Sequence, residues 1–313
     1  MSRLFQLTLI VLVLLSLPLL MVDLFSSVIL SPVGGGLGII LGLVYALLWI
    51  FILRVSAAWP RAGWWWLVSS LLWGGGVSFL VVLLSGLPIL ELAEKFNLTF
   101  TLASWGGAYP EELGKALGVA VILFSFHRLT RPWHGFITGA LVGLGFEVME
   151  NIPYGAYGAL LNPNSDLDGA LITWLSRVVL GPGLHVAFTA LAGWGVGLAI
   201  FTAQRSTLWR WSVALFWVLI AFALHFAWNL MWEDPRFQLV TMAVVAVLLY
   251  PLFIWLYRRC HRLAKQDATQ VELPVMITSL VGLEAYRRSL NSHLVERSGT
   301  DFPHIATPNH GID

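Results

Sequence analysis

The stretch YPEELGKALG places three ionisable side chains together in a chain where only 11% of the residues are charged. On a helix, Glu111, Glu112 and Lys115 span an arc of about 100°. Glutamates can activate water as general bases, and a nearby ammonium group balances their charge. Gly114 and Gly118 lie beside the arc and would allow another helix to approach closely. We therefore predict part of an active site here, against the alternative that PEE only opens a helix.

Three further polar clusters interrupt apolar stretches downstream. In GFEVMENIPYG, two carboxylates and an amide share one helical face at i, i+3 and i+4. HVAFT and HFAWN each pair a histidine with a hydrogen-bonding side chain four residues later. Ionisable residues inside apolar spans are costly and are typical of functional sites. The residues concerned are Glu147, Glu150, Asn151, His185, Thr189, His225 and Asn229.

The segments that must position these residues are long and apolar. Hydrophobic residues make up 58% of the 313 positions and 16 are tryptophan, which lies outside the range of soluble domains. Runs of roughly 18 to 25 apolar residues match the length that a helix needs to cross a bilayer. We predict an all-α, polytopic membrane helical bundle with about eight spans, at approximately 5–22, 36–55, 64–86, 108–126, 135–152, 184–203, 208–232 and 237–257.

The connections between these spans alternate in charge. Arg54 and Arg61 follow the second span and Arg128 and Arg131 the fourth, whereas the intervening connections are acidic or neutral. By the positive-inside rule, both termini are cytoplasmic. All four polar clusters then fall within roughly 10 to 12 Å of the outer interface, at 1.5 Å per residue. This common depth predicts one convergent site that opens to the extracytoplasmic side.

The residue types at this site suit the activation of water. A glutamate can take a proton from water while histidine or asparagine donates to the developing negative charge. Alternatively, Glu150, His185 and His225 hold a divalent metal such as Zn, with Glu111 or Glu112 as the base. The chain has no HExxH, and no GxSxG that would indicate a covalent nucleophile. Carboxylates and histidines also form proton relays, so a proton- or cation-coupled transporter is a second hypothesis.

The series EELGK, GFEVMEN, HVAFT and HFAWN resembles the PrsW family of intramembrane proteases, whose motifs are EExxK, FExxEN, HxxxT and Hxxx(N/D). That family belongs with the type II CAAX prenyl endopeptidases, and the resemblance covers about residues 105–232. It implies a catalytic glutamate pair whose ion partner is Lys115. The site residues that it and the spacing indicate are Glu111, Glu112, Lys115, Glu147, Glu150, Asn151, His185, His225 and Asn229.

The resemblance also implies partners and location. The expected substrate is a single-span membrane protein, such as an anti-sigma factor, cut near its extracytoplasmic side. We expect a multi-pass protein of a bacterial plasma membrane that contacts the lipid bilayer and no nucleic acid. A non-catalytic membrane scaffold related to the protease family is a third hypothesis.

The chain divides into two predicted parts. Residues 1–257 form the transmembrane protease-like domain, with the motif core at about 105–232. Residues 258–313 form a cytoplasmic tail, because the polar, basic run RRCHRLAKQDATQ leaves the membrane there. Helical spacing over 276–290 predicts a short amphipathic helix within this tail, and the segment after it is predicted to be disordered.

Overall fold

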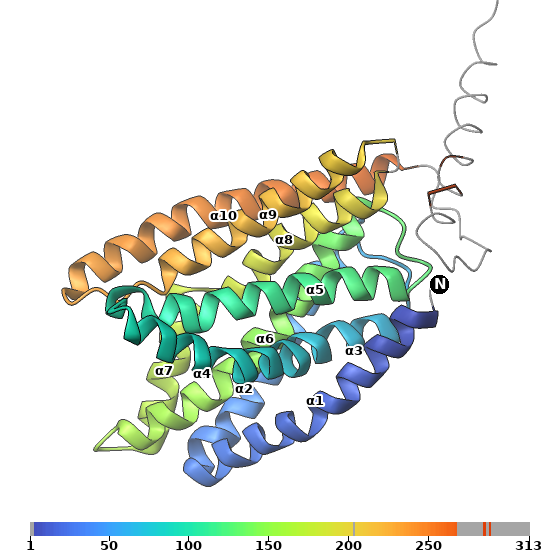
Figure 1. Ribbon diagram of the computed structural model, residues 1–313. Helices are drawn as coiled ribbons and strands as arrows, with labels where there is room; N and C mark the ends of the chain where they lie inside the picture. Colours follow the sequence, from blue (N-terminus) through green and yellow to red (C-terminus); the bar gives the residue numbers. More distant parts are fainter. Residues whose placement is uncertain (1–2, 203, 268–283, 286–287, 289–313) are drawn as a thin grey trace, which may run out of the picture.

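A computed structural model describes residues 3–202, 204–267, 284–285 and 288, and within them the chain is a bundle of helices with no strand (Figure 1). Two π-helical segments, η1 and η3, and a short 3₁₀ turn, η2, extend the α-helices. The elements are α1 (Arg3–Leu30), α2 (Pro32–Arg54), α3 (Trp64–Leu72), η1 (Trp73–Ser78), α4 (Phe79–Lys95), η2 (Thr99–Thr101), η3 (Ser104–Ala108), α5 (Tyr109–Ser125), α6 (Pro132–Leu161), α7 (Asp166–Leu180), α8 (Leu184–Phe201), α9 (Thr207–Trp228) and α10 (Pro235–Gln266).

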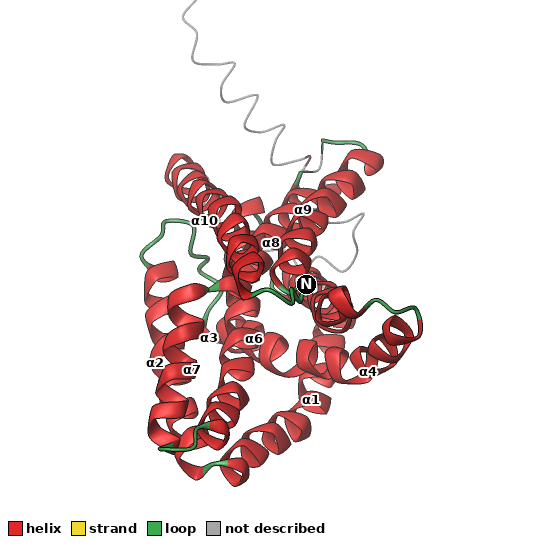
Figure 2. Ribbon diagram, turned by 90° about the vertical axis from the view of Figure 1, so that its left-hand side faces the viewer, coloured by secondary structure: helices red, strands yellow, loops and turns green. Residues whose placement is uncertain are grey.

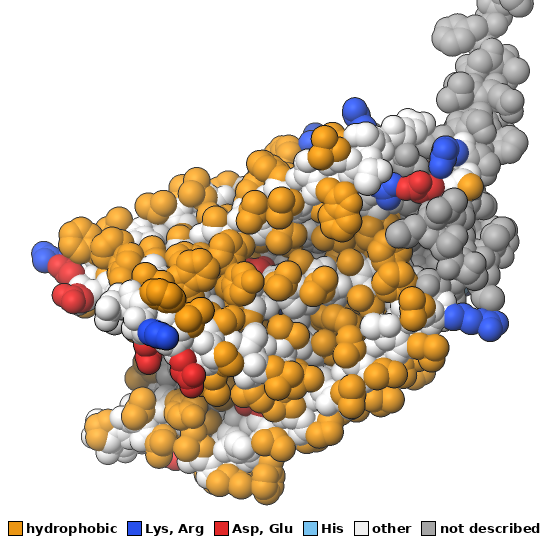
Figure 3. All heavy atoms as spheres, in the orientation of Figure 1, with side chains coloured by type: hydrophobic (Ala, Val, Ile, Leu, Met, Phe, Trp, Pro, Cys, Tyr) orange, Lys and Arg blue, Asp and Glu red, His pale blue; other side chains and the backbone are white. Residues whose placement is uncertain are grey.

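Within the part of the chain that the structure describes, six helical segments are long and apolar enough to cross a membrane, which confirms the predicted all-α, multi-pass class. Their outer faces expose large apolar side chains, and Figure 3 shows hydrophobic side chains over the body of one face, with most charged ones near its two ends. Each of the eight predicted spans coincides with a helix, although the number that cross the bilayer stays a prediction. The six segments are residues 3–30, 32–54, 64–95, 166–201, 207–228 and 235–266.

Helix α6 runs through the middle of the bundle, with the other helices around it (Figure 2). Most of its residues are buried. A Cβ added at Gly135, Gly139 or Gly143 would collide with backbone carbonyl oxygens of α8, so the two helices touch through their backbones. The carbonyl that faces Gly143 belongs to His185. This close contact fixes the depth of His185 beside Glu147, four residues after Gly143 on α6.

The structure corrects the prediction at two places. The sequence pattern indicates no element between the spans 135–152 and 184–203, yet α7 lies there with Ser165 as its N-cap. Helix α7 has 15 residues, fewer than the roughly 20 that a membrane-spanning helix needs, so its sequence does not indicate a span. The second correction concerns α5. The helix begins earlier, at Leu102, and runs through η3 into α5, so Glu111 and Glu112 do not open it. Helix capping therefore does not explain why Glu111 and Glu112 lie at this depth.

Helix α10 continues past the predicted end of the last span, to Gln266. The predicted amphipathic helix at 276–290 and the segment after it lie almost wholly outside the described residues. The division into a membrane domain and a tail stays a prediction.

Candidate active site

Lys115 lies at the centre of a cluster of ionisable side chains and is fully buried. Its Nζ donates to Glu111 Oε2 at 2.9 Å and to Glu112 Oε1 at 3.0 Å, the i−4 and i−3 positions of α5. It also donates to Nδ1 of His185 on α8, at 2.9 Å, and lies 3.9 Å from the centre of the Phe146 ring. One buried ammonium group thus balances two adjacent carboxylates.

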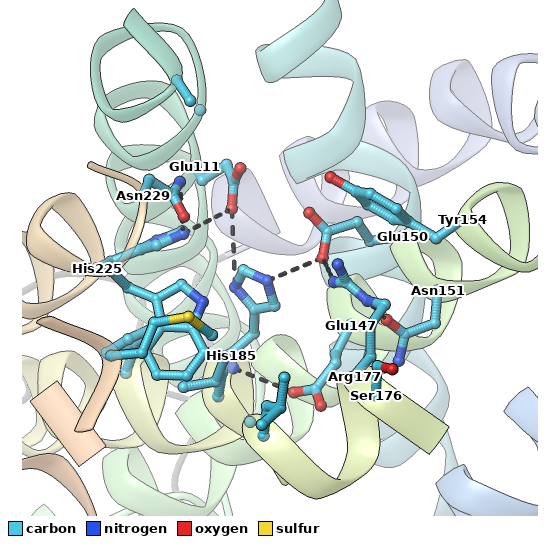
Figure 4. A pocket seen from close by; sticks show the side chains of 18 residues that line it. Glu111, Glu147, Glu150, Asn151, Tyr154, Ser176, Arg177, His185, His225 and Asn229 are labelled. Atoms are coloured by element: carbon cyan, nitrogen blue, oxygen red, sulfur yellow. Dashed lines mark hydrogen bonds and ion pairs between the residues drawn. The ribbon is translucent and has the colours of Figure 1, made fainter. Parts of the chain in front are cut away.

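His185 connects this cluster to α6 and α7. A lysine ammonium has only donors, so Nδ1 of His185 accepts and its Nε2 carries the proton. That Nε2 donates to Glu150 Oε2 at 3.1 Å. Arg177 of α7 in turn donates to Glu150 and to Asn151 (Figure 4). The chain of contacts therefore fixes both the ring orientation and the tautomer of His185.

His225 of α9 closes the other side of the cluster. Its Nδ1 donates to Glu112 Oε1 at 3.0 Å, because a carboxylate only accepts. Nε2 is then free to accept from the Asn229 amide, 3.3 Å away. The ring stacks on Phe188 with centroids 5.0 Å apart and an interplanar angle of 12°. The histidine is held on both nitrogens and on one face.

Glu147 has contacts of a different kind. Its Oε1 accepts from the Tyr45 hydroxyl at 2.6 Å and from the Gly183 amide at 3.1 Å. Its Oε2 accepts from the backbone amides of His185 at 3.0 Å and Val186 at 3.4 Å. These amides belong to the first turn of α8, where a carboxylate complements the helix dipole. Glu147 thus caps α8, and its predicted catalytic role stays a prediction.

A cavity of about 300 Å³ opens beside the cluster and is lined by α5, α6, α7, α8, α9 and α10. Of the two adjacent glutamates, Glu111 lines the cavity and Glu112 lies behind it. Half-buried Gly107 of η3 leaves a space on the cavity wall. A carbon added there would lie 3.2 Å from Glu111 Oε1 and 3.3 Å from Asn229 Nδ2. Glu111 Oε1 and Asn229 Nδ2 therefore approach the same part of the cavity wall, and a water in the cavity there would meet a general base and an amide donor together.

Four side chains are placed so that they can share a metal ion. One ligand atom from each of Glu111, Glu112, His185 and His225 lies within 4.8 Å of the others, and all four are buried. Two imidazoles and two carboxylates are donors that suit zinc. Glu112 Oε2 is buried and has no hydrogen-bond partner among the described residues, so it is a free ligand atom. Glu150, predicted as a ligand, is outside this group, and the identity of any ligands stays a prediction.

The comparison with known families agrees with this geometry. Residues 62–256 match a family model described as PrsW family intramembrane metalloprotease. The chain belongs to this family. No curated protein and no solved structure gives a significant match. As a PrsW family member, the chain is an integral, multi-pass membrane protein of a peptidase family.

The PrsW match is wider than the motif core expected at 105–232. It begins just before α3 and ends within α10, so it includes every helix that lines the cavity. Helices α1 and α2 lie outside it, although α2 contributes Tyr45 to the Glu147 cap.

The structure brings together most of the predicted residues. Eight of the nine contact one another directly or through Arg177, while Glu147 joins them through the backbone of His185. Sequence reasoning missed Arg177, Tyr45 and Gly107. A signal existed for Arg177, because it is the one lysine or arginine between Arg131 and Arg205 and follows the acidic connection with Asp166 and Asp168. Tyr45, one of seven tyrosines, had no such signal.

Proposed function

We propose that this PrsW family protein hydrolyses a peptide bond of a membrane protein with water that Glu111 activates. The observation that carries the proposal is that Glu111 and Asn229 line the same cavity as Gly107, where an added Cβ would lie 3.2 Å from Glu111 Oε1 and 3.3 Å from Asn229 Nδ2. Water in the cavity beside Gly107 meets the base on one side. A scissile carbonyl entering from the cavity meets the amide on the other. The proposed chemistry needs no covalent intermediate with the enzyme.

The reaction proceeds in two proton transfers. Glu111 takes a proton from the water as its oxygen attacks the scissile carbonyl carbon. The carbonyl oxygen becomes negatively charged, and Asn229 exchanges its bond to His225 for one to this oxygen. Glu111 then gives the proton to the leaving nitrogen as the C–N bond breaks. One water and one peptide bond become a carboxylic acid and an amine.

The remaining residues prepare Glu111 for this role. Lys115 forms ion pairs with both glutamates inside the bundle, where a buried carboxylate without a partner is costly. Glu112 orients His225, whose Nε2 holds Asn229 before substrate binds. His185 lies with Nδ1 3.7 Å from Glu111 Oε2 and borders the same cavity. These groups act through Glu111 and Asn229.

The residues also fit a divalent metal such as zinc, held by Glu111, Glu112, His185 and His225. A bound metal would polarise the carbonyl and acidify the water. Lys115 Nζ now contacts three of these four side chains, so a metal and the ammonium group would share the same partners. A chelator added to the purified protein, with metal analysis of the same sample, separates the two modes.

For the substrate, we propose a single-span membrane protein, such as an anti-sigma factor, that is cut near its extracytoplasmic side in a bacterial plasma membrane. Two observations support this side. The acidic and neutral connections adjoin the ends of the helices that are nearer the site. Glu111 also lies about nine residues, roughly 13 Å at 1.5 Å per residue, from the outer start of its helix at Leu102.

The test of this proposal narrows the cavity beside Gly107. We expect Gly107→Ala to reduce cleavage about 10- to 100-fold, because its methyl group crowds Glu111 Oε1 and Asn229 Nδ2 and leaves less room for water between them. Cleavage is measured in proteoliposomes that contain the purified protein and a set of fluorogenic single-span peptides. Gly36→Ala on α2 is the matched control, since a Cβ there meets nothing within 4 Å.

Equal cleavage by the Gly107→Ala protein and the control would place the reaction elsewhere. A wild-type protein that cuts none of the peptides, nor any co-expressed single-span protein, would contradict the proposed activity itself.

A further inference from the structure

A second cavity lies at the opposite end of the bundle from the first. It has a volume of about 770 Å³ and is formed by the end of α2, the segment that joins α2 to α3, the first turn of α3 and the connection between α5 and α6. The charge pattern of the connections makes this the cytoplasmic end. It is remote from the Glu111 cluster, and the proposed reaction makes no use of it.

Three arginines line this cavity, and no carboxylate does so among the described residues. They are Arg54 at the end of α2, Arg61 before α3, and Arg128 after α5. Arg54 and Arg61 form no ion pair within the described part of the chain. Guanidinium groups match the geometry of phosphate oxygens. The cavity is therefore suited to an anion.

The backbone at the cavity adds to this positive field. Helix α3 begins there, and its N-cap, Gly63, makes no side-chain hydrogen bond to the first turn. Gly63 has φ of 83°, a conformation that favours glycine. An uncapped first turn presents amide N–H groups to an anion.

Aromatic side chains place the cavity at the membrane surface. Trp59 and Trp64 line it, and Trp64 stacks on Trp65 with ring centroids 3.6 Å apart. Both Trp64 and Trp65 are exposed, at 58% and 62%. Exposed tryptophans beside arginines are typical of the headgroup layer, where one side of the ring meets acyl chains.

The wall of the cavity is anchored to the bundle. Trp59 packs edge-on against buried Trp66, whose Nε1 donates to Thr138 Oγ1 of α6 at 3.0 Å. Across the cavity, Arg128 donates to the carbonyl of Arg61 at 3.1 Å, which joins the two connections. A bound group would thus meet a largely preformed surface.

We propose that this cavity binds the phosphate headgroup of an anionic phospholipid of the cytoplasmic leaflet, with Arg54, Arg61 and Arg128 as its ligands. A basic cavity between membrane helices on this side can hold such a headgroup while the acyl chains remain in the bilayer. Exposed tryptophans give the chains an apolar surface at the same level. The inference does not depend on proteolysis.

The experiment measures lipid binding to the full chain by native mass spectrometry. Phosphatidylglycerol and phosphatidylcholine with identical acyl chains are compared for the wild type and for Arg54→Gln/Arg61→Gln/Arg128→Gln. The control, Arg258→Gln/Arg262→Gln/Lys265→Gln, removes three exposed charges from α10 at the same end. Size-exclusion profiles and melting temperatures verify that each variant is folded.

We expect the wild type and the control to prefer phosphatidylglycerol, and the cavity variant to lose that preference. Since each basic residue near an anionic surface contributes roughly fivefold, the affinity for phosphatidylglycerol should fall on the order of a hundredfold. A cavity variant that keeps the wild-type preference overturns the site. Equal binding of both lipids by the wild type overturns the anionic ligand.

Two soluble probes distinguish a lipid from free phosphate. Inorganic phosphate and glycerol phosphate are each added in competition with phosphatidylglycerol. We expect neither to displace the lipid at millimolar concentration, because they lack the acyl chains that pack against Trp59 and Trp64. Displacement by either one would assign the cavity to a soluble phosphate and overturn the lipid.

Discussion

Helices α5 and α6 each carry two glutamates inside the bundle, and they use them differently. On α5, Glu111 and Glu112 are adjacent and share the ammonium group of Lys115. On α6, Glu147 and Glu150 are one turn apart and have separate partners. Glu147 accepts hydrogen bonds from backbone amides at the start of α8, whereas Glu150 meets Arg177 and His185.

The hydrogen-bond partners of each buried glutamate, more than its sequence motif, determine whether it stabilises the fold or faces the cavity. Glu147 has all its acceptor positions taken up by the fold and stabilises a helix end. Glu111 keeps Oε1 directed toward the space beside Gly107. On the proposed function, Glu111 performs the chemistry, whereas Glu112 and the α6 glutamates position other groups. The predictions below test that division.

Loss of Lys115 should have the largest effect on stability. Lys115→Met leaves two buried glutamates without their ion-pair partner, and removing one partner of a buried pair costs about 3–5 kcal/mol. We expect the variant to accumulate poorly and to melt at a much lower temperature. Lys95→Met, at the exposed end of α4, is the control and should resemble the wild type. An unchanged melting temperature for Lys115→Met would mean that the α5 pair needs no internal cation.

Loss of Glu147 should have the next largest effect, and this effect should be on the stability of the fold. Glu147→Ala leaves the amides of Gly183 and His185 and the Tyr45 hydroxyl without this acceptor, at a cost of about 1–3 kcal/mol. We expect a lower melting temperature, with cleavage per folded molecule close to the wild-type value. The opposite result, full stability with lost cleavage, would move Glu147 into the group that performs the chemistry.

Changes at Arg177 should have the smallest effect on stability and a moderate effect on cleavage. Arg177→Gln removes the guanidinium that holds Glu150 and Asn151, so His185 loses its fixed orientation. We expect kcat to fall about tenfold with KM nearly unchanged, and Arg177→Lys to recover only part of it, because a lysine does not bridge two acceptors in the same plane. Arg236→Gln is the control, an exposed arginine near the outer end of α10. A kcat for Arg177→Gln equal to that of the control would mean that Arg177 does not contribute to the reaction.

The sequence predicted the helical class and the clustering of the polar residues, because both follow from strong local patterns. Long apolar runs indicate the helices, and i, i+4 spacing places Glu111 with Lys115 and His225 with Asn229 on single faces. The common depth of the clusters came from charge alternation alone. These are properties of single helices or of their ends.

What the sequence could not predict depends on contacts between helices. Nothing in one span tells which carboxylate will meet the amides of α8, so the sequence places both Glu147 and Glu150 among the catalytic candidates and does not predict that Glu147 caps α8. Helix α7 has 15 residues, which is too short for a hydropathy pattern to indicate a membrane span. Arg177, which lies on it, is therefore not among the residues predicted from the sequence. The continuation of α5 through η3 changed the interpretation of Pro110, which is inside a helix instead of at its start.

Glu111→Gln and Glu147→Gln, compared in the purified protein at equal amounts of folded material, show whether Glu111 is the general base. We expect Glu111→Gln to keep a melting temperature near that of the wild type and to lose cleavage by about 10²- to 10⁴-fold, the usual contribution of a general base. Glu147→Gln should keep most of its cleavage and melt earlier. Cleavage that persists in the Glu111→Gln protein would exclude Glu111 as the base.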